Sequence, residues 1–210
     1  MYHLLVIYYG KNGDKGKNLL PLPSNLVIIK FQKLQIMKRL FLSFIVLCMT
    51  CMCAYAGLDI KVTQGDKKFM KTAEGKAVVE ILWDGAQYDN KMPLEQKFDN
   101  LKECQVASLN GFKESLNDNS KKVKTVEDAK DATYKISIKI TNVDQYFKVM
   151  GFVPGNATKI WGTLTISDAK SGDVLLVVDI NEVDGGASPS PIETFSDSFE
   201  ELAEQLTKLK

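Results

Sequence analysis

Residues 57–210 of this 210-residue chain contain no histidine, no arginine and a single cysteine, Cys104. Without histidine, the region has no Ser-His or Cys-His nucleophilic dyad and no histidine-based zinc site. Without arginine, it lacks the side chain that clamps phosphates and carboxylates through two parallel hydrogen bonds. A lone cysteine forms no intrachain disulfide, so packing must hold the fold together.

Positive charge is also scarce in this region. It holds 20 lysines against 25 acidic residues, a net charge of −5, whereas the whole chain carries +1. Nucleic-acid-binding domains draw much of their affinity from basic patches, so the balance argues against a nucleic-acid partner. No glycine-rich nucleotide motif stands between a strand and a helix, and we expect no cofactor.

The pattern of a secretory signal peptide begins at residue 37. Met37-Lys38-Arg39 is a basic start, residues 40–47 form an apolar core, and Ala54-Tyr55-Ala56 matches a signal peptidase site. The pattern predicts cleavage near Ala56 and a periplasmic or extracellular protein that begins at Gly57. We interpret residues 1–36 as an extension of the gene model, with Met37 as the true start.

Two other interpretations of residues 37–56 fit the sequence less well. The apolar run is short for a membrane anchor, which needs roughly 20 residues. A lipoprotein signal has a leucine three residues before its cysteine and a small residue directly before it. None of the three cysteines of this segment, Cys48, Cys51 and Cys53, fits this pattern. We therefore expect a mature protein with no transmembrane span.

Apolar periodicity predicts a single α+β domain over residues 57–210. Strands are predicted at 58–63, 77–83, 122–126, 134–141, 160–166 and 174–180. A long amphipathic helix is predicted from Leu94 to Leu116, and a closing helix after Ser196 as N-cap. The least regular stretch, residues 142–159, is predicted to be a loop. This order predicts a two-layer sandwich with a mixed or mainly antiparallel sheet of five to six strands and two main helices on one face.

Aromatic residues near position 161 suggest a binding surface. Trp161 falls on the outward phase of its strand. The preceding predicted loop carries Tyr146, Phe147, Met150 and Phe152, and a glycine loop at Gly185 and Gly186 follows the last strand. Together these residues predict an exposed surface for an envelope protein or a glycan. In the alternative, the loop folds over the sheet and buries Trp161 in a small core.

Carboxylates are the remaining candidates for a metal-binding or catalytic role. A group of them, Asp168, Asp173, Asp179, Glu182 and Asp184, surrounds the last predicted hairpin, but its spacing matches no EF-hand loop and we predict no metal site. Asp144 with Asp179 or Asp184 would serve a glycan hydrolase only if the two converged in a cleft. We assign no catalytic residue and predict a non-catalytic accessory or binding protein of the cell envelope. The alternatives are a secreted carboxylate-dependent enzyme and a structural subunit of a surface assembly.

Several segments together resemble a known group of proteins. They are the helix end Phe112–Leu116, the strand start Ala132-Thr133-Tyr134, the segments Trp161–Asp168 and Ser171–Leu175, and Glu200–Ala203. The pattern resembles a diffuse group of Gram-negative envelope proteins of unknown function, related in fold to penicillin-binding-protein activator lipoproteins and curli-secretion lipoproteins. The resemblance implies an α/β sandwich that acts as a non-catalytic accessory or assembly factor, and it carries over no catalytic residues. This chain differs from the lipoprotein members of the group, because it lacks their lipoprotein signal.

The signal-peptide prediction is tested by N-terminal sequencing of the exported protein. We expect the first residue to be Gly57, because Ala54 and Ala56 are the small residues that signal peptidase accepts. Recovery of a protein that begins at Met1 would contradict both the cleavage site and the assigned start.

Overall fold

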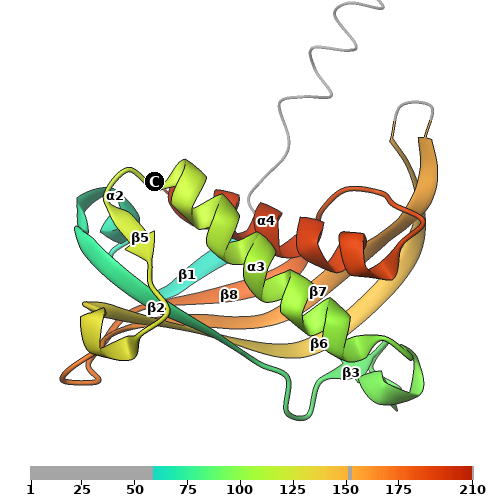
Figure 1. Ribbon diagram of the computed structural model, residues 1–210, viewed down its shortest axis with the longest axis horizontal. Coiled ribbons are helices and arrows are strands. Elements are labelled where there is room, and N and C mark those ends of the chain that lie inside the picture. The colour runs from blue at the N-terminus through green and yellow to red at the C-terminus, as the bar shows by residue number, and fades with distance from the viewer. Residues whose placement is uncertain (1–58, 151–152, 210) are drawn as a thin grey trace, which may run out of the picture. The chain divides into compact units, whose positions relative to one another are not determined.

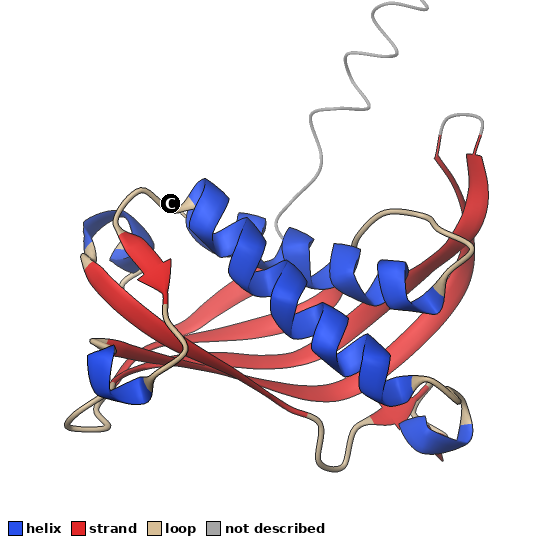
Figure 2. Cartoon of the chain, in the orientation of Figure 1, coloured by secondary structure: helices blue, strands red, loops and turns tan. Residues whose placement is uncertain are grey.

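A computed structural model describes residues 59–150 and 153–209, which form one large sheet with helices against one face (Figures 1 and 2). The strands are β1 Ile60–Gly65, β2 Gly75–Leu82, β3 Gln87–Tyr88, β4 Met92–Pro93, β5 Val123–Thr125, β6 Tyr134–Met150, β7 Val153–Asp168 and β8 Val174–Asp184. The helices are α2 Phe69–Thr72, α3 Leu101–Asn119 and α4 Pro191–Lys208, with 3-10 turns at Leu94–Gln96 and Ala129–Asp131. The α+β prediction is confirmed, but five to six strands was too few, because the short β3 and β4 bring the sheet to eight.

The sheet is mixed, as predicted. Its main path runs β1-β8-β7-β6-β2-β5, and β3 joins β6 and β4 beside it. β1, β8, β7 and β6 are antiparallel neighbours, whereas β2 pairs in parallel with β5 and β6. The hairpin predicted between β7 and β8 is confirmed, since the amide of Asp168 donates to the carbonyl of Asp173 at 2.9 Å.

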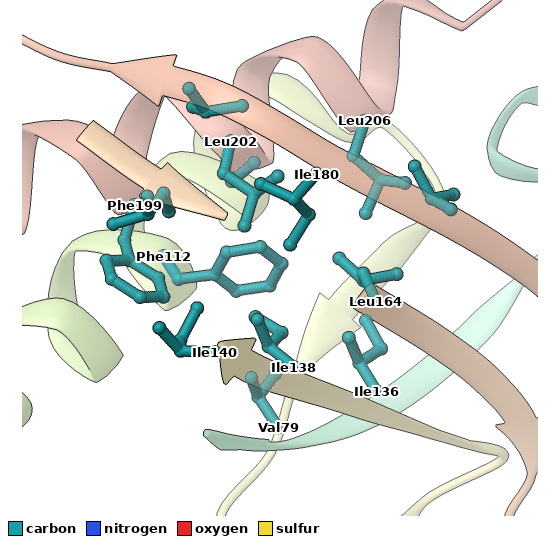
Figure 3. Packing of buried hydrophobic residues seen from close by; sticks show 14 of the residues in the cluster. Val79, Phe112, Ile136, Ile138, Ile140, Leu164, Ile180, Phe199, Leu202 and Leu206 are labelled. Atoms are coloured by element: carbon teal, nitrogen blue, oxygen red, sulfur yellow. The ribbon is translucent and has the colours of Figure 1, made fainter. Parts of the chain in front are cut away.

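The core lies between the sheet and the helices α3 and α4 (Figure 3). Ile136, Ile138 and Ile140 of β6 are buried there, together with Phe112 of α3 and Phe199 of α4. Burying each such side chain stabilises the fold by about 1.5–3 kcal/mol. The alternate residues of β6 face the other side of the sheet, on which the described part of the chain places no long helix (Figure 1). We call that side the open face.

Both long helices begin at positions other than those predicted. Leu94 lies in a 3-10 turn, and α3 starts only at Leu101, although Leu94 remains buried in the core. Helix α4 starts at Pro191 with Ser190 as N-cap, because proline suits the first turn of a helix. Ser196 therefore lies inside α4, where its hydroxyl donates to Oε1 of Glu200 at 2.9 Å.

The loop predicted at residues 142–159 is wrong, because most of this segment is strand. β6 and β7 pair continuously from Tyr134 with Asp168 to Met150 with Val153. An extra residue in β6, Thr141, forms a β-bulge that shifts the buried phase from even to odd positions. Val143 is buried where strict alternation would expose it. Because of this reversal, the sequence pattern does not indicate the second half of β6 as a strand.

A bend of the sheet is centred on Gly162 in β7. β6 has its bulge opposite this point, and β8 has another between Ile180 and Val183. A Cβ atom on Gly162 would lie 2.1 Å from the carbonyl oxygen of Lys139 and 3.1 Å from Cα of Ile140. Only glycine allows this approach of the β6 backbone, so the bend depends on Gly162.

We expect Gly162→Ala to destabilise the protein by about 2 kcal/mol or more, since backbone atoms have to move to admit the methyl group. The free energy of unfolding is measured by urea denaturation. Thr163→Ala, one residue along on the open face, is the control and should cost less than about 1 kcal/mol. Equal urea midpoints for Gly162→Ala and the wild type would contradict the assignment.

Candidate functional site

Trp161 lies on the open face, directly beside the bend at Gly162. Its neighbours Ile160 and Leu164 are fully buried in the helix-covered core, and β7 itself contains no extra residue between them. Strand alternation therefore places Trp161 and Thr163 on the opposite side. The tryptophan is half-buried and lines a groove of about 560 Å³. The groove's other lining residues are Asp59, Ile60, Lys61, Thr141, Gly162, Thr163, Asp179, Ile180 and Asn181. We call it the Trp161 groove.

Polar side chains line the groove together with Trp161. Lys61, Asp179 and Thr163 lie side by side on three neighbouring strands, and Asn181 follows on the same strand as Asp179. Within residues 59–150 and 153–209, no hydrogen bond or ion pair involves any of these four side chains, and Asn181 bonds through its backbone amide, to the Asp59 carbonyl. A half-buried aromatic ring edged by free donors and acceptors can hold a ligand that has both apolar and hydroxyl surfaces.

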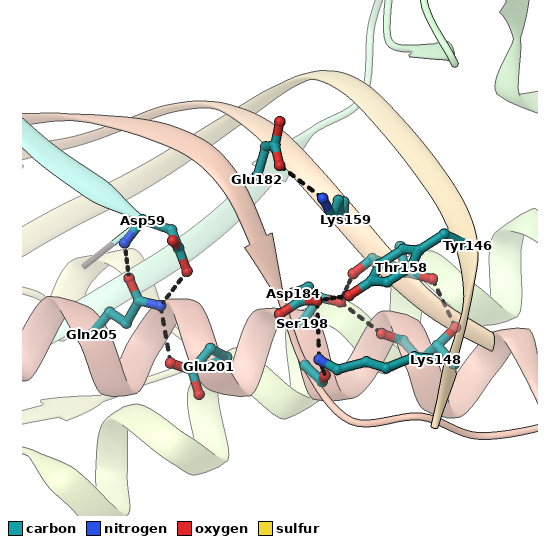
Figure 4. Close-up of polar contacts among 12 residues, drawn as sticks. Asp59, Tyr146, Lys148, Thr158, Lys159, Glu182, Asp184, Ser198, Glu201 and Gln205 are labelled. Atoms are coloured by element: carbon teal, nitrogen blue, oxygen red, sulfur yellow. Dashed lines mark hydrogen bonds and ion pairs between the residues drawn. The ribbon is translucent and has the colours of Figure 1, made fainter. Parts of the chain in front are cut away.

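Tyr146 meets Asp184, the last residue of β8, in a polar cluster on the far half of the hairpin (Figure 4). Its hydroxyl donates to the carboxylate of Asp184. Lys148 Nζ donates to Asp184 Oδ2 and to the Gly185 carbonyl, both at 3.0 Å. Lys159 Nζ lies 5.0 Å from the centroid of the Tyr146 ring and donates to Glu182 Oε2 at 2.7 Å. We call Tyr146, Lys148 and Asp184 the Asp184 cluster.

The Asp184 cluster is an anchor for the hairpin. Burial raises the pKa of Asp184, to which the neighbouring carboxylates of Asp59 and Glu201 contribute, and burial lowers the pKa of Lys148. Both shifts disfavour the charged forms. The direct contacts act against this cost of burial, since Lys148 donates both to Asp184 and to the Gly185 carbonyl. These contacts tie β6 to the end of β8 across β7.

Gly185 and Gly186 pack tightly against Asp197 of α4. A Cβ atom on Gly185 would lie 2.2 Å from the Asp197 carbonyl carbon, and one on Gly186 would lie 2.4 Å from Asp197 Oδ2. Farther along this loop, Ser188 exchanges two backbone hydrogen bonds with Asn156 of β7, at 2.9 and 3.0 Å. The glycines thus let the loop lie between α4 and the hairpin, where it holds Asp184 in place.

The structure divides the predicted binding residues among three places. Trp161 lines the groove, Tyr146 and the two glycines belong to the anchored region, and Phe147 is exposed on the hairpin surface. Two others, the side chain of Met150 and the whole of Phe152, lie outside the described residues. Sequence reasoning missed the groove partners Lys61 and Asn181, whose only signal is their place on the outward phase of a strand.

The acidic residues do not form a shared site. Asp144 and Asp184 pair with Lys159 from opposite sides, so a lysine stands between them. Asp179 lies on the far side of the bulge in β8, in the Trp161 groove. Among the described residues, no three metal-ligating side chains come together. Asp144 therefore converges with neither Asp184 nor Asp179 in a cleft, as the enzymatic alternative required.

Comparison with solved structures finds distant similarities. No family model matches the chain, and no curated protein matches it. The dodecameric PelC from Paraburkholderia phytofirmans matches with a TM-score of 0.41 and 14% identity, over 70% of this chain and 96% of PelC. A Helicobacter pylori protein described as a neuraminyllactose-binding hemagglutinin homolog matches with a TM-score of 0.36 and 11% identity, over 65% and 85%. Both similarities are too remote to carry a functional conclusion, and the resemblance to an envelope group stays a prediction.

No helix in the described part of the chain is long and apolar enough to span a bilayer.

Cys104 is fully buried in α3, and we expect it to be unreactive in the folded protein. Burial, with a smaller contribution from Glu103, raises the pKa of its thiol to about 11. At pH 8 the thiolate is then about a thousandth of the total, against about a quarter for an ordinary cysteine with a pKa near 8.5. Because the folded pKa is the higher, the fold loses stability as the pH rises above about 8.5.

The reactivity of the Cys104 thiol is measured by its rate of reaction with a thiol-specific disulfide reagent at pH 8. The folded protein should react far more slowly than the protein in urea. Immediate reaction of the folded protein would show that Cys104 is accessible and ionised.

Proposed function

We propose that the protein is an exported, non-catalytic binding or accessory protein of the cell envelope, and that it binds a glycan in the Trp161 groove. One observation carries the proposal: a half-buried tryptophan lies on the uncovered face of the sheet, among polar side chains that have no partner within the described residues. The predicted signal peptide supports the location.

The chemistry of the groove suits a sugar better than other ligand classes. One side of a sugar ring presents C–H groups that stack on an indole face, while its hydroxyls both donate and accept hydrogen bonds. Asp179 supplies acceptors, Lys61 supplies donors, and Asn181 supplies both. Lys61 lies opposite Asp179 on the next strand, so the groove lacks the concentrated positive charge that anionic ligands require.

The position of the groove favours a polymeric ligand. It lies open on the face of a sheet, so a chain can extend beyond it in both directions along the strands. The Asp184 cluster lies farther along this face and has its hydrogen-bonding groups occupied internally. We therefore assign Tyr146, Gly185 and Gly186 a supporting role, in which they fix the shape of the surface beside Trp161.

The test is glycan binding by Trp161→Ala, measured by isothermal titration calorimetry against a panel of neutral oligosaccharides. Loss of the stacking surface should weaken binding about tenfold, which corresponds to about 1.4 kcal/mol and lies in the range of aromatic contacts. Trp83→Phe is the matched control, because Trp83 packs 5.7 Å from Phe199 of α4 and does not line the groove.

Tryptophan fluorescence provides a second measurement. In the Trp83→Phe variant Trp161 is the only tryptophan left in residues 57–210, so its emission should shift to the blue when a glycan covers it. Unchanged affinity in Trp161→Ala, or no binding of any oligosaccharide by the wild type, would overturn the proposed function.

A further inference from the structure

Two large apolar side chains are exposed near the far end of the β6–β7 hairpin. Phe147 is 68% exposed and Val149 is 59% exposed. The hairpin here extends past the rest of the sheet, because β8 pairs with β7 only from Lys159 onward (Figure 1). The two side chains therefore lie on a projecting part of the molecule.

Phe147 and Val149 continue the core-facing side of the sheet beyond the reach of the helices. Thr158 marks that side, since its hydroxyl lies 2.7 Å from the hydroxyl of Thr194 in α4. Thr158 pairs with Gln145, and the next pairs on the same side are Phe147 with Asn156 and Val149 with Pro154. In the core this side is covered by helices, but here it is open to solvent.

This exposed side of the hairpin carries no charge. Gln145, Phe147, Val149, Pro154 and Asn156 are all uncharged. Lys148, which lies between Phe147 and Val149 in the chain, faces the other way and is tied to Asp184 and Gly185. The contacts of Lys148 and Tyr146, with the two backbone bonds between Asn156 and Ser188, fix the hairpin before any partner binds.

We propose that this side of the hairpin inserts shallowly into a lipid bilayer. A stable protein interface needs about 800 Å² from each partner with matched shape, more than two side chains on a two-stranded ribbon supply. Insertion into lipid needs apolar area without charge, and no matched shape. Because residues 57–210 carry a net charge of −5, the attraction is hydrophobic, and it is weak and reversible.

The Trp161 groove plays no part in this inference. The groove lies on the open face, whereas Phe147 and Val149 lie on the opposite side of the hairpin. Failure of vesicle binding would leave glycan binding by Trp161 unaffected, and the reverse also holds.

The experiment is co-flotation of the purified protein with phosphatidylcholine vesicles. The double variant Phe147→Ser, Val149→Ser should bind vesicles at least about tenfold more weakly than the wild type, since two apolar side chains are lost. Val106→Ser is the matched control, because Val106 of α3 is 60% exposed and lies away from the hairpin. This control should bind vesicles as tightly as the wild type does. Both proteins have the same N-terminal segment, so that segment does not affect the comparison.

Further measurements separate the possible outcomes. Phe147→Leu should retain vesicle binding, while an unchanged urea midpoint for the double variant shows that its fold is intact. Binding that is equal in the double variant and the wild type would overturn the proposal. So would binding that requires anionic lipid and disappears in salt. Self-association of the wild type in sedimentation velocity without lipid, lost in the double variant, would instead assign the surface to a second copy of the chain.

Discussion

The close contact between Gly162 and the backbone of β6 is the constraint on which the rest of the structure depends. It lies between the bulge at Thr141 and the bulge of β8, so three neighbouring strands change direction at one point. The core continues across the bend, because Leu164 on one side and Val143 on the other are both buried in it and Thr158 contacts α4. Farther along, the sheet narrows to a long hairpin that is anchored through Asp184. The Trp161 groove lies at the bend itself, and a side chain at position 162 would disturb it.

The sequence predicts this sheet well where alternation is undisturbed. Ile136, Ile138 and Ile140 follow period two, and the structure buries all three. The prediction fails from Thr141 onward, because one inserted residue reverses the phase and turns Val143 inward. A bulge leaves no signature in composition, so the second half of β6 resembles an irregular segment. The predicted helix starts are wrong for a different reason. Leu94 and Ser196 occur in sequence patterns that fit a helix start, but α3 begins at Leu101 and α4 at Pro191.

The candidate site was predictable only in part. The outward phase of Trp161 follows from its own strand, where no residue is inserted. Its partners Lys61 and Asn181 come from strands distant in sequence, and their arrangement depends on the register between strands. The contact of Tyr146 with Asp184 spans 38 residues of chain and depends on the bend. Gly185 and Gly186 were visible as glycines, but only the structure shows that Asp197 requires them.

The two sides of the hairpin differ in chemistry, one being polar and the other apolar. Tyr146 and Lys148 lie on the side of the Trp161 groove, and their polar groups are used within the protein. Phe147 and Val149 continue the core side past the start of α4 at Pro191, where no helix covers them. A bilayer that receives these two residues therefore approaches the molecule from the helix-covered side, opposite the groove. Membrane contact would then leave Trp161 facing away from the lipid, free to hold a glycan in the surrounding envelope.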